Sequence, residues 1–436
     1  MLRRIPLLAV LLSLIVTVGV LSTTLKSSAP QLNNSQTSLQ SNVESSAFYC
    51  AGLTSAKQGA QGLVAIVNTS RHSRQVTYVV SNETSTSSPV NVMVPARQTV
   101  IVNPETVLSS VSGYGVSAEV EGGGVFGEER IVGSVSQVRC SSSGVTQWFD
   151  AGLNTQVGAA AYVSVLNPTA TPAVFDLTAF NVGGYAAPQP FQGVAIPAHR
   201  EVLVDLSSQI VNSKDIGVRI RVLRGSVVAS GVQLYGSTAS LSTGVLEASP
   251  QSDFALVATK QGASSTIEVT NPTSQLAQVS MKVTLGNYQI APQQVEIQPY
   301  SSSHVVITPN PAIPAAGEAN VLVTSNVAVV TSLTSGTAQT LLHSSALLPT
   351  QSVVALGQGG ADIEVANATN KTLAVTIEAV GGRSVQVSIA GGQNVDVSTQ
   401  FAWVRSDIAT LITADKPALL VNQLAMGTAV PLLTNP

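Results

Sequence analysis

The sequence predicts an all-β fold, namely four tandem immunoglobulin-like β-sandwich units after an N-terminal transmembrane helix or signal sequence. Three observations support this fold class. A strand-turn-strand motif recurs four times, apolar residues alternate with a period of two within each copy, and a long uncharged segment opens the chain. Beyond that segment no long stretch has helical periodicity.

The first 30 residues read MLRRIPLLAVLLSLIVTVGVLSTTLKSSAP. Arg3 and Arg4 precede an uncharged run over 5–25, which as a helix spans about 30 Å and crosses a bilayer. Basic residues before such a run keep the N-terminus in the cytoplasm, so the rest of the chain is exported. We predict a signal anchor at 1–25 and a single-pass cell-membrane protein with an extracellular C-terminal region. The alternative is a cleaved signal peptide and a secreted protein.

The repeat is marked by three landmarks that follow one another in the same order. The first is a strand that ends in Asn, the second is a short apolar step such as VPA or IPA, and the third is a Gly that closes an apolar strand. The landmark residues are Asn68, Asn167, Asn271 and Asn367; Pro95, Pro197, Pro299 and Ala390; and Gly133, Gly236, Gly336 and Gly427. The predicted divisions are a flexible Ser/Asn/Gln-rich linker at 26–47 and β-sandwiches at 48–145, 146–250, 251–349 and 350–436.

Alternation within the second copy predicts about seven short strands separated by turn signals, which is typical of an immunoglobulin-like sandwich. In AYVSVLN, for example, Val163 and Val165 share one strand face and Ser164 lies on the other. The segment IGVRIRVLRGSVVASGVQLYG is interpreted as a hairpin that turns near Arg224 and Gly225. The segment EGGGVFGEE is interpreted as a hairpin tip whose carboxylates Glu121, Glu128 and Glu129 form a solvated acidic turn. The alternative is that these carboxylates, with Glu119, loosely hold a calcium ion.

These motifs resemble a family of exported actinobacterial proteins of unknown function, built from repeated β-sandwich units behind an N-terminal membrane segment. The resemblance covers residues 48–436 and depends on the NPT step, the IPA step with EVLVDL, and the closing Gly strand. These are turn and core residues, so the resemblance implies a fold and a location but no catalytic site.

The two cysteines, Cys50 and Cys140, bracket the first unit. In an oxidising compartment an even number of cysteines predicts a disulfide. Two free buried thiols are the alternative.

Composition and spacing argue against most kinds of chemistry. Charged residues make up only 10% of the chain and the net charge is -3, so the overall charge does not attract nucleic acid. The glycine-rich loop of EGGGVFGEE is followed by a strand pattern, whereas nucleotide binding requires a helix. The four histidines lack metal-ligand spacing. We therefore expect no catalytic residues, no metal, no cofactor and no nucleotide, and the scarcity of carboxylates predicts a fold that tolerates acid.

One surface of the second unit is a candidate for ligand contact. Tyr185 lies in the loop NVGGYAAPQP, where an aromatic ring can lie against a sugar. Arg219 and Arg221 share a strand face, with Arg224 at the following turn, and could meet anionic polymer. The alternatives are a packed loop anchor for Tyr185 and an ordinary solvated strand face for the arginines.

The sequence thus favours a non-enzymatic, extracytoplasmic cell-envelope protein with a structural or scaffold role. Its expected partners are the membrane, through the N-terminal segment, and envelope proteins or wall polymer. The alternative function is a module that binds cell-wall glycan or anionic polymer, centred on the second unit.

Overall fold

The computed structural model describes residues 45–425 with gaps at 111, 133–136, 237, 259–264, 286–287, 308–317, 336–339, 344–351, 356–360, 368–370, 380–382, 392, 402–409 and 416–418. The predicted membrane segment at 1–25 and nearly all of the predicted linker lie outside the described residues. Within the described part, no helix is long and apolar enough to span a bilayer.

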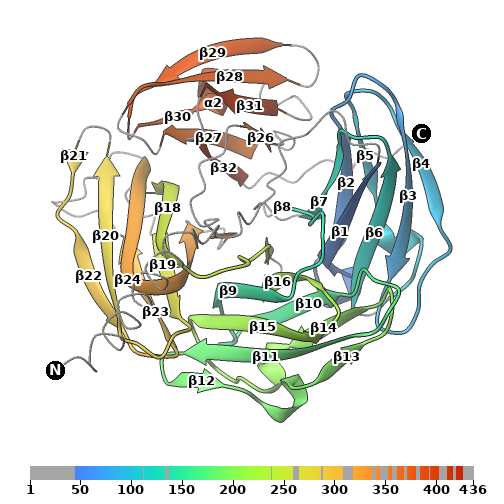
Figure 1. Ribbon diagram of the computed structural model, residues 1–436, viewed down its shortest axis with the longest axis horizontal. Helices are drawn as coiled ribbons and strands as arrows, with labels where there is room; N and C mark the ends of the chain where they lie inside the picture. Colours follow the sequence, from blue (N-terminus) through green and yellow to red (C-terminus); the bar gives the residue numbers. More distant parts are fainter. Residues whose placement is uncertain are drawn as a thin grey trace, which may run out of the picture. The chain divides into compact units, whose positions relative to one another are not determined.

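The first sandwich consists of two antiparallel sheets with strand orders β1-β6-β3-β4 and β5-β2-β7-β8 (Figure 1). Two short 3-10 helices, η1 (Ala56–Gln58) and η2 (Pro104–Thr106), lie in its connections. The strands are β1 (Ser45–Thr54), β2 (Gly62–Asn68), β3 (Arg74–Ser81), β4 (Val90–Val94), β5 (Thr99–Val102), β6 (Gly113–Glu121), β7 (Val125–Ile131) and β8 (Gln137–Arg139).

The second sandwich repeats this plan with sheets ordered β14-β10-β16-β17 and β12-β11-β15-β9, and β13 also pairs with β11. Its 3-10 helices are η3 (Gln189–Phe191) and η4 (Leu206–Ser208). The strands are β9 (Gln147–Leu153), β10 (Ala159–Leu166), β11 (Ala173–Asn181), β12 (Gly184–Ala186), β13 (Val194–Ile196), β14 (Glu201–Asp205), β15 (Ile216–Arg224), β16 (Val228–Tyr235) and β17 (Thr238–Ser242).

In the third sandwich one long strand, β24 (Glu318–Ser335), belongs to both layers. Its first half pairs with β18 and β20, and its second half pairs with β19 and β25. The other strands are β18 (Ser249–Ala258), β19 (Ser265–Asn271), β20 (Ala277–Leu285), β21 (Tyr288–Gln289), β22 (Gln293–Ile297), β23 (Ser301–Ile307) and β25 (Thr340–His343).

The fourth sandwich has sheets ordered β26-β31-β28-β29 and β30-β27-β32. A single helical turn, α2 (Val397–Gln400), follows β30. The strands are β26 (Ser352–Ala355), β27 (Ala361–Asn367), β28 (Leu373–Ala379), β29 (Ser384–Ile389), β30 (Asn394–Asp396), β31 (Thr410–Ala414) and β32 (Leu419–Ala425). The all-β fold of sandwich units predicted from the sequence is confirmed, whereas the exact domain boundaries stay predictions.

Each sandwich has its own hydrophobic core. Four separate clusters of buried side chains centre on Val64 in the first sandwich, Phe175 in the second, Ile267 in the third and Ile377 in the fourth. The cores form because alternate residues of facing sheets point inward, as the period of two requires. The disulfide predicted between Cys50 and Cys140 is confirmed, and it lies within the first core.

The repeated Asn is more than a turn residue, because its buried side chain joins two chain segments. In the second sandwich the amide nitrogen of Asn167 donates to the carbonyls of Thr171, Ile196 and Pro197 at 2.8, 3.2 and 3.1 Å. Its amide oxygen accepts from the backbone N–H and the hydroxyl of Thr169 at 3.0 and 2.8 Å. The Thr of the NPT step is therefore part of the same hydrogen-bond network.

The same network recurs at Asn68 and Asn271, and it corrects one sequence landmark. Asn68 donates to the carbonyl of Pro95, whereas Asn271 donates to that of Gln298. Gln298, rather than Pro299, is therefore the counterpart of Pro95. Alignment by proline placed the second landmark of the third copy one residue too late. The hydrogen bond from the Asn side chain requires only a backbone carbonyl at this position, so the residue need not be proline.

Replacing Asn167 with Ala should lower the free energy of unfolding of the second sandwich by about 3 kcal/mol, since buried polar groups lose their partners. The change can be followed by urea denaturation with Trp148 fluorescence in a Trp403→Phe background, because Trp148 is fully buried in the second core. The control is Asn181→Ala, which removes one exposed hydrogen bond to Gly183. Equal effects of the two substitutions would contradict the role of the network.

Both hairpins predicted from the sequence are wrong. The turn at Gly225 joins β15 to β16, but β15 pairs with β11 and β9, whereas β16 pairs with β10 and β17. Likewise β6 and β7 belong to different sheets. Each turn crosses from one layer of a sandwich to the other, so that both strands face the same core. Alternation alone does not distinguish such a crossing from a hairpin.

Candidate functional site

The outer face of β10 is not exposed to solvent. Leu166 forms a buried cluster with Ala51 of the first sandwich and Val228 of β16. The Ser164 hydroxyl, also buried, donates a hydrogen bond to the Ala51 carbonyl. The strand therefore buries one face in its own core and the other against the preceding sandwich.

Two carboxyl groups are buried near the boundary between the first and second sandwiches. Both carboxylate oxygens of Glu129 accept from the Gly52 N–H at 3.0 Å, and Glu201 Oε1 lies within hydrogen-bond distance of the Ser164 hydroxyl oxygen, at 2.7 Å. Burial raises the pKa of Glu129 to about 7 and that of Glu201 to about 8, although these hydrogen bonds oppose the rise. The Glu129 charge adds to the rise in the pKa of Glu201.

The predicted acidic turn in EGGGVFGEE is wrong for two of its three carboxylates, which are buried. Glu119 and Glu121 are exposed on β6, but Glu128 and Glu129 lie in β7 and are only 5% and 1% exposed. Burial raises the pKa of Glu128 to about 7, even though Arg130 and Arg139 lower it. The structure therefore does not gather these carboxylates around one solvated site.

The boundary between the second and third sandwiches has a similar construction. The Ser332 hydroxyl donates to the Ala151 carbonyl at 2.9 Å, and the Ser302 hydroxyl donates to the Phe180 carbonyl at 3.3 Å. Val330 of the third sandwich packs with Ala151 of the second in one buried apolar cluster. Side chains of one sandwich thus satisfy backbone groups of the next.

A cluster of ionisable side chains lies at this second boundary. Asp215 comes from the segment before β15, and Glu268 and His304 face each other on the paired strands β19 and β23. Asp215 Oδ2 lies 2.6 Å from His304 Nδ1. Burial and the neighbouring Asp215 raise the pKa of Glu268 well above its ordinary value, and Lys214 opposes this rise.

Tyr185 lies in β12 and is 64% exposed. Its ring packs edge-to-face against Tyr300 of the third sandwich, with the ring centres 5.7 Å apart. The aromatic surface is therefore shared by two sandwiches. The sequence did not suggest that Tyr300 would be a neighbour of Tyr185.

The arginines and Tyr185 do not form one compact site. Phe180 pairs with Tyr185 on one side and with Gly217 on the other, whereas Arg224 lies seven residues beyond Gly217 on β15. At the rise of an extended strand this separation along the strand is about 20 Å. Arg224 is exposed at the strand end.

The other two arginines differ from each other. Arg221 is exposed and forms an ion pair of 2.9 Å with Asp176, which lowers the pKa of that carboxyl together with the Gly193 N–H. Arg219 is half-buried, and its Nε has no hydrogen-bond partner. Only part of the predicted arginine surface, made up of Arg219, Arg221 and Arg224, is thus available to an anionic ligand.

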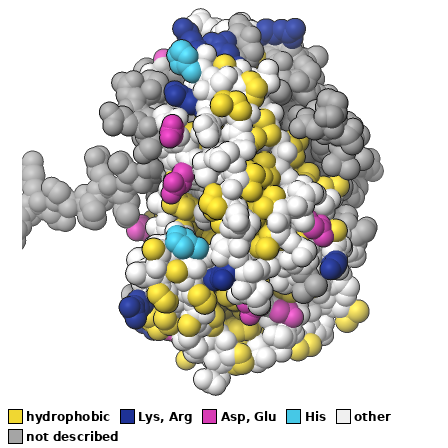
Figure 2. All heavy atoms as spheres, turned by 90° about the vertical axis from the view of Figure 1, so that its right-hand side faces the viewer, with side chains coloured by type: hydrophobic (Ala, Val, Ile, Leu, Met, Phe, Trp, Pro, Cys, Tyr) yellow, Lys and Arg dark blue, Asp and Glu magenta, His cyan; other side chains and the backbone are white. Residues whose placement is uncertain are grey.

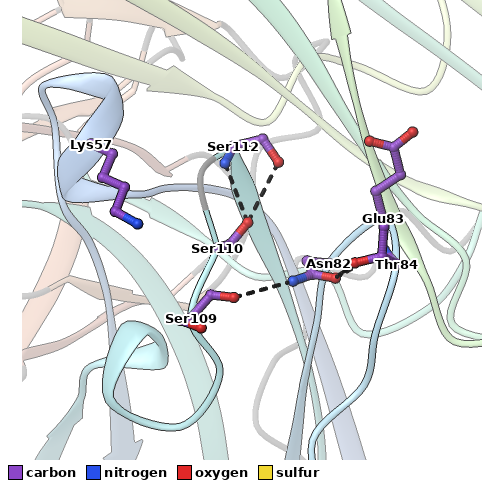
Figure 3. A pocket seen from close by; sticks show the side chains of 7 residues that line it. All are labelled: Lys57, Asn82, Glu83, Thr84, Ser109, Ser110 and Ser112. Carbon is purple, nitrogen blue, oxygen red and sulfur yellow. Dashed lines mark hydrogen bonds between the residues drawn. The ribbon is translucent and has the colours of Figure 1, made fainter.

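A pocket of about 250 Å³ lies in the first sandwich. Its lining is polar, and Lys57 and Glu83 lie on opposite sides of it (Figure 3). Asn82 donates to the Ser109 carbonyl at 3.5 Å and accepts from the Thr84 N–H at 2.9 Å. Part of the lining is thus already engaged in hydrogen bonds within the pocket.

The surface is sparsely charged. On the face shown in Figure 2, hydrophobic and uncharged polar side chains predominate, and of the few charged ones several Lys or Arg side chains lie at its upper edge. Among the described residues, two groups bring three metal-ligating side chains together. In the group Cys50–Glu129–Cys140 the two cysteines are bonded to each other in the disulfide and cannot act as thiolate ligands. The group Asp215–Glu268–His304 is therefore the remaining candidate for a metal site among the described residues. Sequence spacing missed this group because its members lie far apart in the chain.

The fold defines a protein of tandem antiparallel β-sandwiches. The chain belongs to DUF5719, a family of unknown function whose model matches residues 132–400. A search of the curated proteins finds no match.

One solved structure that is similar to this chain is described as a tetra-tandem repeat in the extending region of a large adhesion protein. The sequence identity is 11%, the TM-score is 0.15, and the match covers 88% of this chain and 100% of that chain. At these values the likeness carries no argument about function.

Proposed function

We propose that the protein is a non-enzymatic structural component of the cell envelope, outside the cytoplasmic membrane. The observation that supports this is the way consecutive sandwiches are joined. The first three sandwiches share buried boundaries, at which hydroxyls such as those of Ser164 and Ser332 bond to the backbone of a neighbour. Such boundaries fix one sandwich against the next, which suits a spacer or scaffold.

The N-terminal segment supports the location in this proposal. Arg3 and Arg4 before the uncharged run favour an anchor with the sandwiches outside, and cleavage of the segment would instead release them. A disulfide between Cys50 and Cys140 fits an oxidising compartment. An actinobacterial origin stays a prediction from the sequence.

The location can be tested by adding protease to spheroplasts that carry the full chain. We expect fragments from the sandwiches while a cytoplasmic marker stays intact. Membrane fractionation then distinguishes anchored from released protein. Full protection of residues 48–436 would contradict the proposal, and a soluble form that begins near residue 30 would favour cleavage.

A second candidate function is binding of wall glycan, because Tyr185 and Tyr300 form an exposed aromatic pair. If this pair binds sugar rings, Tyr185→Ala in the full chain should lower retention on cell-wall glycan by about tenfold, as loss of one aromatic anchor costs roughly 1–2 kcal/mol. Tyr185→Phe, which keeps the ring, is the control. Unchanged retention of the Tyr185→Ala variant would exclude this surface.

A further inference from the structure

The cluster of Asp215, Glu268 and His304 contains buried carboxylate oxygens without a hydrogen-bond partner. These atoms are Glu268 Oε2 and Asp215 Oδ1, and Asp215 Oδ1 has the Lys214 ammonium as an ion-pair partner at 4.0 Å. The two residues are only 9% and 6% exposed. Leaving a buried carboxylate oxygen without a partner is costly, so groups of this kind are normally paired or bound to a metal.

The three side chains converge on one point. Each offers a ligand atom, and these atoms all lie within 4.8 Å of one another. Glu268 and His304 are held by direct pairing across β19 and β23, and Asp215 approaches from the second sandwich. Zinc bonds to His nitrogen and carboxylate oxygen at about 2.0–2.2 Å, so small side-chain rotations bring all three ligand atoms into its coordination shell.

We propose that Asp215, Glu268 and His304 bind one divalent transition-metal cation across the boundary between the second and third sandwiches. An imidazole with two carboxylates suits zinc, whereas calcium and magnesium prefer all-oxygen sites. The side chain of His304 is 30% exposed, which leaves a side open to water as a further ligand. This site does not depend on the envelope location proposed above.

The positively charged Lys214 side chain competes with this cation for the same ligand atoms. Its ammonium nitrogen lies 3.3 Å from His304 Nε2 and 4.0 Å from Asp215 Oδ1. Because its side chain is 46% exposed, it can turn outward into water when a metal binds. Removing its charge should therefore strengthen metal binding, which a purely structural role of the cluster would not produce.

The test is a zinc titration of the metal-free full chain in competition with a chromophoric chelator. The wild type should bind one equivalent, and Glu268→Gln and His304→Gln should each weaken binding by at least about tenfold, since loss even of a hydrogen-bond partner of a metal ligand typically costs about 10–100-fold. Lys214→Met should tighten binding, and His72→Gln, at an exposed histidine, should leave it unchanged. Calcium in excess should not displace the zinc.

Two measurements keep the test decisive if a variant fails to fold. X-ray absorption of the zinc-loaded wild type should show one imidazole and carboxylate or water oxygens, without sulfur. Zinc should also raise the melting temperature of the wild type but not of Glu268→Gln. The proposal is overturned if the wild type binds no zinc, if Glu268→Gln and His304→Gln bind it equally well, or if Lys214→Met binds it more weakly.

Discussion

Raising the pH from 5 to 9 should destabilise the protein, with a loss on the order of 5 kcal/mol in the free energy of unfolding. Besides Glu128, whose pKa is also raised to about 7, the groups responsible are Glu129 and Glu201, which are 1% and 0% exposed. Burial raises their pKa values to about 7 and about 8, against an ordinary value of 4.5 in the unfolded chain. A pKa difference of one corresponds to about 1.4 kcal/mol.

The direction follows from proton binding. Between pH 4.5 and about 8 the folded protein holds protons that the unfolded chain has released. Stability therefore decreases as pH rises through this range, and it is fully retained below pH 4.5. This predicts tolerance of mild acid, as the composition did, but for a different reason. The sequence suggested a lack of titrating groups, whereas the structure has buried carboxyls that favour the protonated state.

Thermal melts of the full chain at pH 5 to 9 measure this effect. Glu201→Gln, which replaces the protonated carboxyl with a neutral amide, should reduce the loss at high pH. Glu247→Gln, at an exposed position, should leave the profile unchanged. A melting temperature that rises between pH 6 and pH 9 would contradict the assignment of neutral buried carboxyls.

Loss of the disulfide is the other large expected effect. The bond closes a sequence separation of 90 residues within the core of the first sandwich. In the chain-entropy model a loop of this length contributes about 4–5 kcal/mol. Cys140→Ser should therefore unfold much of the first sandwich under conditions in which the third remains folded.

Limited proteolysis in increasing urea, with fragments identified by mass spectrometry, separates the sandwiches. Reduced wild type is the matched control, because it should lose as much stability as Cys140→Ser. If the oxidised and reduced forms resist proteolysis equally, the bond does not stabilise the first sandwich.

The parts of the fold that local patterning determines were predictable. A period of two identifies strands such as β10, and an even pair of cysteines at the ends of one unit identifies the disulfide. Asn167 was recognised as a repeated residue, although its contacts with Ile196 and Pro197 could not be inferred, since they join segments that are distant in sequence.

Contacts between layers and between sandwiches were not predictable. Ser164 shares a strand face with Leu166, and only the structure shows that this face meets Ala51 of the first sandwich. Glu129 has the sequence context of a solvated turn, yet the chain crosses between sheets there and buries it. The group of Asp215, Glu268 and His304 exists only because the second and third sandwiches meet.

The central claim is that neighbouring sandwiches are joined by close-packed boundaries, and Gly217→Val tests it most directly. A side chain at Gly217 would overlap Thr270 of the third sandwich. Hydrogen exchange of the full chain, read by mass spectrometry, should show faster exchange in β19 and β23 as well as in β15, whereas Gly183→Ala, at an exposed glycine, should change neither. Faster exchange confined to the second sandwich would contradict the claim.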